Sequence, residues 1–144
     1  MDHPANDKKE EQMQTPLMIE LVPLSDTFHI YKLEEGQEIP PQMLSAGFFS
    51  VTSTPEEVSV MTNCPRNFPM FKSEKGWKGF KVEGILDFSL VGIIYDIIQP
   101  LKDNLISVFV ISTFNTDFVF VKEDQFDKAQ EIFKLSDNIN LKSR

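Results

Sequence analysis

Several side chains in the second half of the chain could together recognise a small molecule that carries charges of both signs. Asp87 and Asp117 are acids suited to an ammonium or guanidinium group. Ser107 and Thr113 add hydroxyls, and Phe114 adds an apolar wall. If the fold brings these residues to one edge, their chemistry favours a zwitterion such as an amino acid.

Each of these side chains also has a purely structural interpretation. Asp87 is more often a helix cap than a ligand contact, and Asp117 can stabilise a turn through its own side chain. Ser107 and Thr113 are of types that strands commonly carry. An exposed aromatic ring usually packs on something, so Phe114 is the hardest to explain by structure alone. The ligand hypothesis therefore depends on the elements that position these residues.

A predicted β-hairpin carries four of them. Two apolar, β-rich runs within Ile106–Val121 are separated by the polar-centred segment Ser112–Asp117, which marks a turn between paired strands. A similar pattern lies at Phe48–Met61, where a strand again ends in Ser-Thr, an acid follows and the turn is one residue shorter. The repeat suggests a duplicated small domain, and such domains often bind a ligand between their copies.

A predicted helix begins near Ser89, directly after Asp87. Apolar residues recur on one of its faces at the helical period, and Asp87 or Ser89 can serve as its N-cap. The unpaired N–H groups and the positive dipole end of this helix would suit a ligand carboxylate. Pro100 should kink or terminate the helix.

The remaining patterns predict an α+β fold. Strands are expected at 17–22, 28–33, 77–82 and 139–141, at most one helical turn within 36–44, an irregular link at 64–76, and a second helix with Asp124 as N-cap. The second half then has the order β-α-β-β-α-β, which predicts an antiparallel sheet with both helices on one face. The first half fits the same plan with eroded helices.

Composition narrows the function classes. The chain has 144 residues, 41% of them hydrophobic and 13 of them Phe, enough for one compact unit or two lobes sharing a core. A net charge of −8 argues against nucleic acid and anionic membranes as partners. The lysines that recur every third residue, at 72, 75, 78 and 81, are interpreted as a solvated edge. Residues 1–15 are polar and predicted to be a disordered tail.

Neither enzyme chemistry nor metal binding finds support. His3 lies in the predicted tail and His29 in a predicted strand, and neither has an evident nucleophile or acid partner in the sequence. Cys64 is the single cysteine, which fits a reducing, cytoplasmic location. Because no metal-ligand spacing and no phosphate-binding glycine loop occurs, we expect no catalysis, no cofactor and no metal.

Several motifs, in order and at the right spacing, resemble the ACT domain family. They are Leu86-Asp87-Phe88-Ser89-Leu90, Pro100-Leu101, Ile106-Ser107-Val108, Ser112-Thr113-Phe114, Thr116-Asp117-Phe118 and Glu123-Asp124. The resemblance covers roughly residues 17–140 and is dense between 76 and 135. Within the family, the chain is similar to small stand-alone proteins with two ACT-like lobes and to the cytosolic arginine sensors of animal cells.

The resemblance implies a non-catalytic regulatory module that binds an amino acid between equivalent lobes. It implies tandem ferredoxin-like βαββαβ lobes, a degenerate one at 16–75 and a second at 76–142. In a chain of this length the two second lobes would come from different copies, which implies a homodimer. With Ser89 added for its helix N-terminus, the candidate ligand-binding residues are Gly84, Asp87, Ser89, Ser107, Val108, Thr113, Phe114 and Asp117. The alternative is a protein–protein interaction module that uses the same sheet edge without a ligand.

Overall fold

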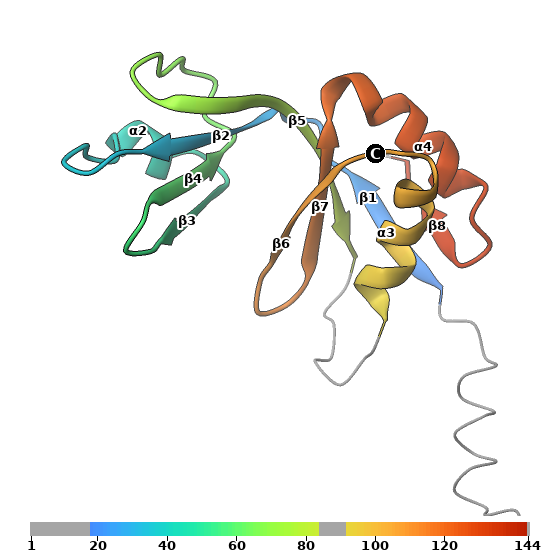
Figure 1. Ribbon diagram of the computed structural model, residues 1–144. Helices are drawn as coiled ribbons and strands as arrows, with labels where there is room; N and C mark the ends of the chain where they lie inside the picture. The colour runs from blue at the N-terminus through green and yellow to red at the C-terminus, as the bar shows by residue number, and fades with distance from the viewer. Residues whose placement is uncertain (1–17, 84–91, 144) are drawn as a thin grey trace, which may run out of the picture.

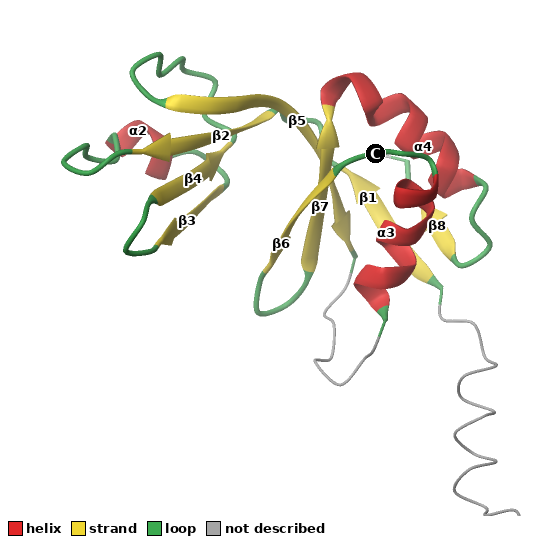
Figure 2. Cartoon of the chain, in the orientation of Figure 1, coloured by secondary structure: helices red, strands yellow, loops and turns green. Residues whose placement is uncertain are grey.

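One curled sheet of eight strands organises the part of the chain that the structure describes (Figures 1 and 2). The computed structural model describes residues 18–83 and 92–143, so Gly84, Asp87 and Ser89 lie outside the described residues. The strands are β1 Ile19–Pro23, β2 Phe28–Leu33, β3 Phe49–Ser53, β4 Val58–Thr62, β5 Lys72–Val82, β6 Val108–Ser112, β7 Asp117–Lys122 and β8 Ile139–Leu141. The helices are α2 Pro41–Leu44, α3 Ile93–Asp103, α4 Phe126–Lys134 and the 3-10 turn Glu123–Gln125. This mixture of one sheet and few helices confirms the predicted α+β class.

Strand β5 links the two halves of the sheet. Its first part pairs with β2, and its second part pairs with β1 on one edge and with β7 on the other. The expected strand at 77–82 was therefore too short, because residues 72–76 continue it rather than forming an irregular link. Those residues are mostly charged and exposed, which hides the alternation that marks a strand. The expected lobe boundary at 75–76 falls inside β5.

The same strand order occurs in both halves. In the first half of the sheet the order is β3-β4-β2-β5, with α2 between β2 and β3. In the second half it is β6-β7-β5-β1-β8, with α3 between β5 and β6 and α4 between β7 and β8. The strands of each half can be numbered in chain order, from β2 in the first half and from β5 in the second. If β1 is left out, both halves then have the order 2-3-1-4 across the sheet.

Strand β1 is an insertion into the second half. It pairs antiparallel with β5, from Leu21 opposite Val82 to Pro23 opposite Phe80, and parallel with β8 on its other edge. The expectation of a purely antiparallel sheet was wrong at this pair, because a strand inserted antiparallel to β5 must run parallel to β8. The sequence distance between β1 and its partners conceals this arrangement.

Both long helices cover one face of the second half. Ile93, Ile97 and Leu101 of α3 share a buried cluster with Ala129 and Phe133 of α4 and with sheet residues of β1, β5, β7 and β8. This placement confirms the expectation of helices on one face (Figure 2).

The ends of these helices differ from the predictions. Gly92, with a φ of 87°, is the N-cap of α3, rather than Asp87 or Ser89. Pro100 does not end α3, which continues to Asp103. Packing of the fully buried Leu101 offsets the loss of the backbone hydrogen bond that proline cannot donate. A 3-10 turn precedes α4, so Gln125 takes the N-cap position instead of Asp124.

An aromatic cluster on the opposite face joins the two halves. Phe48, beside β3, packs edge-on against Phe118 and Phe28, with ring centroids 5.1 and 5.3 Å apart. Phe120 of β7 lies in the same cluster, fully buried. Its ring crosses β5 at Gly79, where a Cβ atom would lie 2.7 Å from a ring carbon. Only glycine therefore allows this close approach between ring and strand.

The first half has a smaller core, which an irregular segment covers where the second half has a second helix. Residues 63–71 cover the sheet there, and Cys64 is buried among them as a free thiol. Thr62 is buried too; its hydroxyl donates to the carbonyl of Met43 at 3.1 Å and accepts the N–H of Cys64 at 3.1 Å. These bonds attach α2 and the irregular segment to β4.

Candidate functional site

The tip of the β6–β7 hairpin is held closed by two threonines. The N–H and hydroxyl of Thr113 donate to the carbonyl of Thr116 at 2.8 and 3.0 Å. The N–H of Thr116 donates back to the hydroxyl of Thr113 at 3.2 Å. Asp117 follows the turn, half-buried, as the first residue of β7 and the partner of Ser112. The threonines supply the bonds that close the turn, which leaves the Asp117 carboxylate for another role.

A second bond fastens this tip to the end of β5. Thr116 is only 6% exposed, and its hydroxyl donates to the carbonyl of Val82 at 2.5 Å. Val82 is the last residue of β5 and lies two positions before Gly84, the first candidate residue of the following segment. The hairpin tip and the start of the strand-to-helix connection are thus fixed side by side.

Thr116 was missed by the sequence reasoning. A signal was present, because Thr113 and Thr116 are three residues apart across a predicted turn, where hydroxyls bond back to the chain. What the sequence could not indicate was the bond from Thr116 to Val82, since 34 residues separate the two.

The hairpin of the first half is built in the same way. The N–H of Thr54 donates to the carbonyl of Glu57 at 2.9 Å, and its hydroxyl accepts the N–H groups of Glu56 and Glu57, each at 3.2 Å. Residues 54–57 and 113–116 connect the strands, so the prediction that the first turn is shorter was wrong. Glu57 occupies the position of Thr116 rather than that of Asp117, and the acids of the two turns are not equivalent.

The described candidate residues form two groups, one at each end of β6. Thr113, Phe114 and Asp117 gather at the tip, where the Phe114 side chain is 83% exposed. Ser107 and Val108 lie at the opposite end of the strand, because Val108 pairs with Val121. At the ordinary strand rise, Val108 is about 13 Å from Ser112. The fold of one chain therefore does not bring the two groups together.

Strand β6 is an edge of the sheet. Among the described strands, it pairs only with β7. The backbone groups on its other side are a template for a further strand. Both groups of predicted residues consequently lie along one open edge.

His29 has a structural role in the described part of the chain. Its Nδ1 atom accepts the N–H of Gly76 at 3.2 Å, where the β2–β5 register shifts. Burial lowers the pKa of His29, and the nearby Lys75 lowers it further, while Glu123 opposes them. The neutral imidazole that this hydrogen bond requires is therefore favoured.

Neither a metal cluster nor a membrane helix occurs in residues 18–83 and 92–143. No three His, Cys, Asp or Glu side chains there come close enough to hold a metal ion. No helix in these ranges is long and apolar enough to cross a bilayer.

One segment of the chain matches a known protein family. Residues 72–134 match the ACT domain family. This ACT-matching segment runs from the start of β5 to the end of α4 and includes the β6–β7 hairpin. This match, which spans less than half of the chain, agrees with the resemblance expected from the sequence.

Known relatives extend the likeness beyond that segment. The solved structure of protein Atu0741 from Agobacterium tumefaciens has a TM-score of 0.80 and 29% identity, covering 88% of this chain and 94% of that one. The human protein CASTOR3P is 32% identical over 87 residues, covering 51% of this chain and 53% of that protein. The chain thus spans about half the length of this curated relative.

A regulatory subunit shares the fold as well. The regulatory subunit of aspartate kinase from Thermus thermophilus has a TM-score of 0.52 and 7% identity, covering 78% of this chain and 93% of that one. At such low identity the likeness concerns the fold alone.

Proposed function

We propose that this protein is a non-catalytic regulatory module of the ACT type that binds an amino acid. The observation that carries the proposal is the hairpin tip, where Thr113, Phe114 and Asp117 gather and Thr116 binds the end of β5. The family match of residues 72–134 supports it, as do the regulatory domains among the structural neighbours. A buried free thiol at Cys64 is consistent with a cytoplasmic location.

The chain is proposed to contain two lobes after a tail at 1–15. Residues 16–75 would form the degenerate first lobe and residues 76–142 the second. The common strand order of the two halves of the sheet supports this division, as does the common threonine-closed hairpin. Because β5 serves both halves, the lobes would share a strand rather than a linker.

The ligand site is proposed to be shared between two copies of the chain. Val110 is the middle residue of β6. If two β6 strands pair antiparallel about Val110, Ser107 and Val108 of one copy come beside Ser112 and Thr113 of the other. The two groups, which are about 13 Å apart within one chain, would then lie beside each other across the two-fold axis of the dimer.

The proposed contacts suit each part of an amino acid. Asp117 would receive an ammonium or guanidinium group. The first turn of α3 would offer N–H groups to the carboxylate, since its N-cap Gly92 makes no side-chain capping bond. Phe114 would cover the apolar part of the ligand. Of the remaining candidates, Gly84, Asp87 and Ser89 would complete the site from the strand-to-helix connection.

A thermal-shift screen of the twenty amino acids at millimolar concentration tests this function. A ligand at one hundred times its dissociation constant adds about 2.7 kcal/mol, which raises the midpoint by several degrees for a domain of this size. Asp117→Asn should abolish the shift, whereas Glu57→Gln, in the equivalent turn of the first half, should retain it. A flat response across the panel would refute the proposal. A dimer without any ligand response would instead favour the protein-interaction module.

A further inference from the structure

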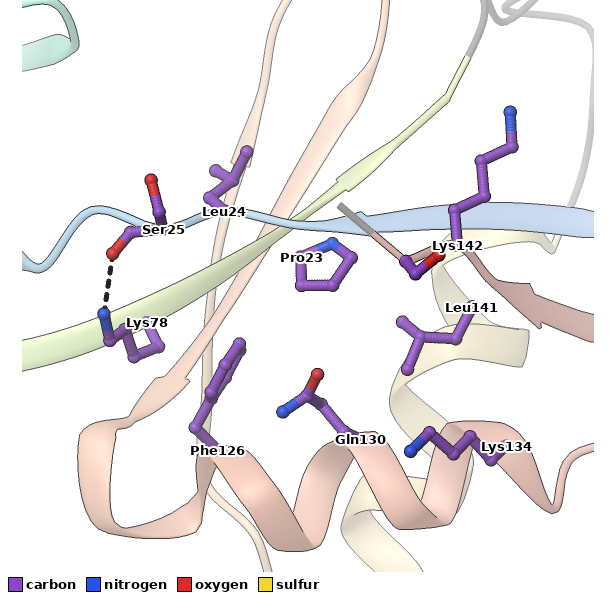
Figure 3. A pocket seen from close by; sticks show the side chains of 10 residues that line it. Pro23, Leu24, Ser25, Lys78, Phe126, Gln130, Lys134, Leu141 and Lys142 are labelled. Carbon is purple, nitrogen blue, oxygen red and sulfur yellow. Dashed lines mark hydrogen bonds between the residues drawn. The ribbon is translucent and has the colours of Figure 1, made fainter.

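A groove of about 380 Å³ lies between α4 and the sheet (Figure 3), and no residue of the β6–β7 hairpin lines it. Its walls come from the end of β1 and the residues after it, from β5, from α4 and from the end of β8. The volume is within the range of small-molecule sites. The groove shares no residue with the hairpin tip or with the other candidate ligand-binding residues.

The floor of the groove is apolar with one amide at its centre. Phe126, Gln130 and Lys134 recur every fourth residue along α4, so they lie on one face of the helix and line the groove. Pro23 and Leu141 face them from β1 and β8, and the Gln130 amide points into the space between (Figure 3). An apolar body of a few carbon atoms would replace water over this floor.

The charged side chains of the groove are all cationic. Lys78, Lys134 and Lys142 line it, and the described lining residues include no carboxylate. The net charge of the chain is −8, so a local set of three lysines is a departure from its surroundings. Lysines at this density attract an anion, and the absence of an acid from the lining disfavours a ligand ammonium.

Two of these lysines differ in how firmly they are held. The ammonium of Lys78 donates to the carbonyl of Ser25 at 2.8 Å, which fixes it at one end of the groove. Lys134 pairs with Glu131 at 3.3 Å, but both side chains are more than half exposed. Such a surface pair contributes roughly 0–1 kcal/mol, so Lys134 can turn towards a ligand at little cost. Lys142 pairs with Glu20 at 2.9 Å, and its ammonium points away from the groove (Figure 3), which leaves Lys78 and Lys134 as the cations that a ligand can reach.

We propose that this groove binds a small organic carboxylate with an apolar body. The carboxylate accepts hydrogen bonds from Gln130 and from the Lys134 ammonium, and the body lies on Leu141 and Phe126 and extends towards the Lys78 end of the groove. A zwitterionic amino acid fits poorly, because its own ammonium would approach Lys78 or Lys134. The groove and the hairpin tip are thus two sites with opposite charge preferences, and the first does not depend on the second.

A titration followed by amide NMR signals tests the proposal. The probes are pentanoate, its neutral analogue pentanamide and inorganic phosphate, each up to tens of millimolar, where a dissociation constant of about 1 mM is measurable. Pentanoate is expected to shift the signals of Gln130 and Lys78, and the other two probes only weakly. An equal effect of pentanamide would overturn the charge recognition, and an equal effect of phosphate would overturn the apolar contribution.

Three lysine variants make the test specific. Lys134→Gln should raise the dissociation constant for pentanoate about tenfold, and Lys78→Met should raise it less, because Lys78 lies at the other end of the groove. Lys102→Gln is the control, because this exposed residue lies in the last turn of α3 and does not line the groove. Lys134→Gln disturbs only an exposed ion pair, so the test holds even if Lys78→Met destabilises the fold. Equal effects of all three variants, or no saturable shift, would refute the proposal, whereas Asp117→Asn should leave pentanoate binding unchanged.

Discussion

The hydroxyl of Thr116 donates to the carbonyl of Val82 at 2.5 Å, and both residues are buried. One residue closes the β6–β7 hairpin and the other ends β5. The bond therefore couples the position of the hairpin tip to the strand that leads into the connection before α3. A ligand bound at the tip would act on both segments through this contact.

Replacing Thr116 with valine should cost stability and weaken ligand binding together. The valine has nearly the same shape but leaves the Val82 carbonyl unpaired, which costs about 1–3 kcal/mol. Thr62→Val is the control, because Thr62 is also buried and its hydroxyl also donates to a backbone carbonyl, but it lies in the first half. Chemical denaturation should show similar losses for both variants, with a reduced amino-acid response only for Thr116→Val. Reduced responses in both variants would contradict the proposed coupling.

Gly79→Ala should destabilise the fold through the aromatic cluster. Its Cβ atom would lie 2.7 and 2.9 Å from two ring carbons of the buried Phe120. Such overpacking costs about 1–3 kcal/mol. At Gly47 the nearest atom to a new Cβ is the Asn63 amide at 3.6 Å, so Gly47→Ala should change the free energy of unfolding by less than about 0.5 kcal/mol. Equal values for the two variants would mean that Phe120 moves aside without cost.

Stability should depend on pH through His29. Its pKa in the folded chain lies below the ordinary value of 6.5, so protonation favours the unfolded chain. The stability that the fold gains by keeping His29 neutral is fully present above about pH 6.5 and is lost as the pH falls through the folded-state pKa. Because the imidazole is only half-buried, the loss should be on the order of 1 kcal/mol at most.

The variant His29→Gln isolates this effect. Denaturation at pH values from neutral to acidic should show a steeper loss of stability for the unmodified chain than for His29→Gln. His3 is present in both proteins and cancels in the comparison. Parallel pH profiles would exclude a role for His29 in the acid response.

Local patterns predicted the elements that depend on neighbouring residues. The two hairpins, the strand at Phe28–Leu33 and the short strand at Ile139–Leu141 agree with the structure, since alternation and turn residues determine them. The single turn of α2 also agrees, because Pro40-Pro41 restricts the segment.

The remaining features of the fold could not be predicted from local patterns, because they depend on long-range strand pairing or involve mostly charged residues. Nothing near Ile19–Pro23 indicates that this strand is inserted between β5 and β8. The lysines at 72, 75, 78 and 81 are interpreted from the sequence as a solvated edge, but Lys78 lines the groove. Because side chains on a strand alternate with a period of two, a spacing of three residues does not indicate that the lysines belong to a strand.

The candidate site was predicted only in part for the same reason. Thr113 and Asp117 are neighbours in sequence and meet at the tip. Val108 belongs to the same strand, and only its pairing with Val121 shows that it lies at the far end. Whether Ser107 and Val108 reach a ligand depends on a second copy of the chain, which no local pattern describes.

Complementation between two inactive variants tests the shared site most directly. Asp117→Asn disables the tip, and Ser107→Arg blocks the exposed start of β6; each alone should lose binding of the amino acid that most stabilises the unmodified chain. In a mixed dimer, one of the two shared sites combines an intact tip with an intact β6 start. Calorimetric titration of an equimolar, equilibrated mixture should therefore recover about a quarter of the normal number of sites. A mixture that stays inactive would contradict a site built from two copies.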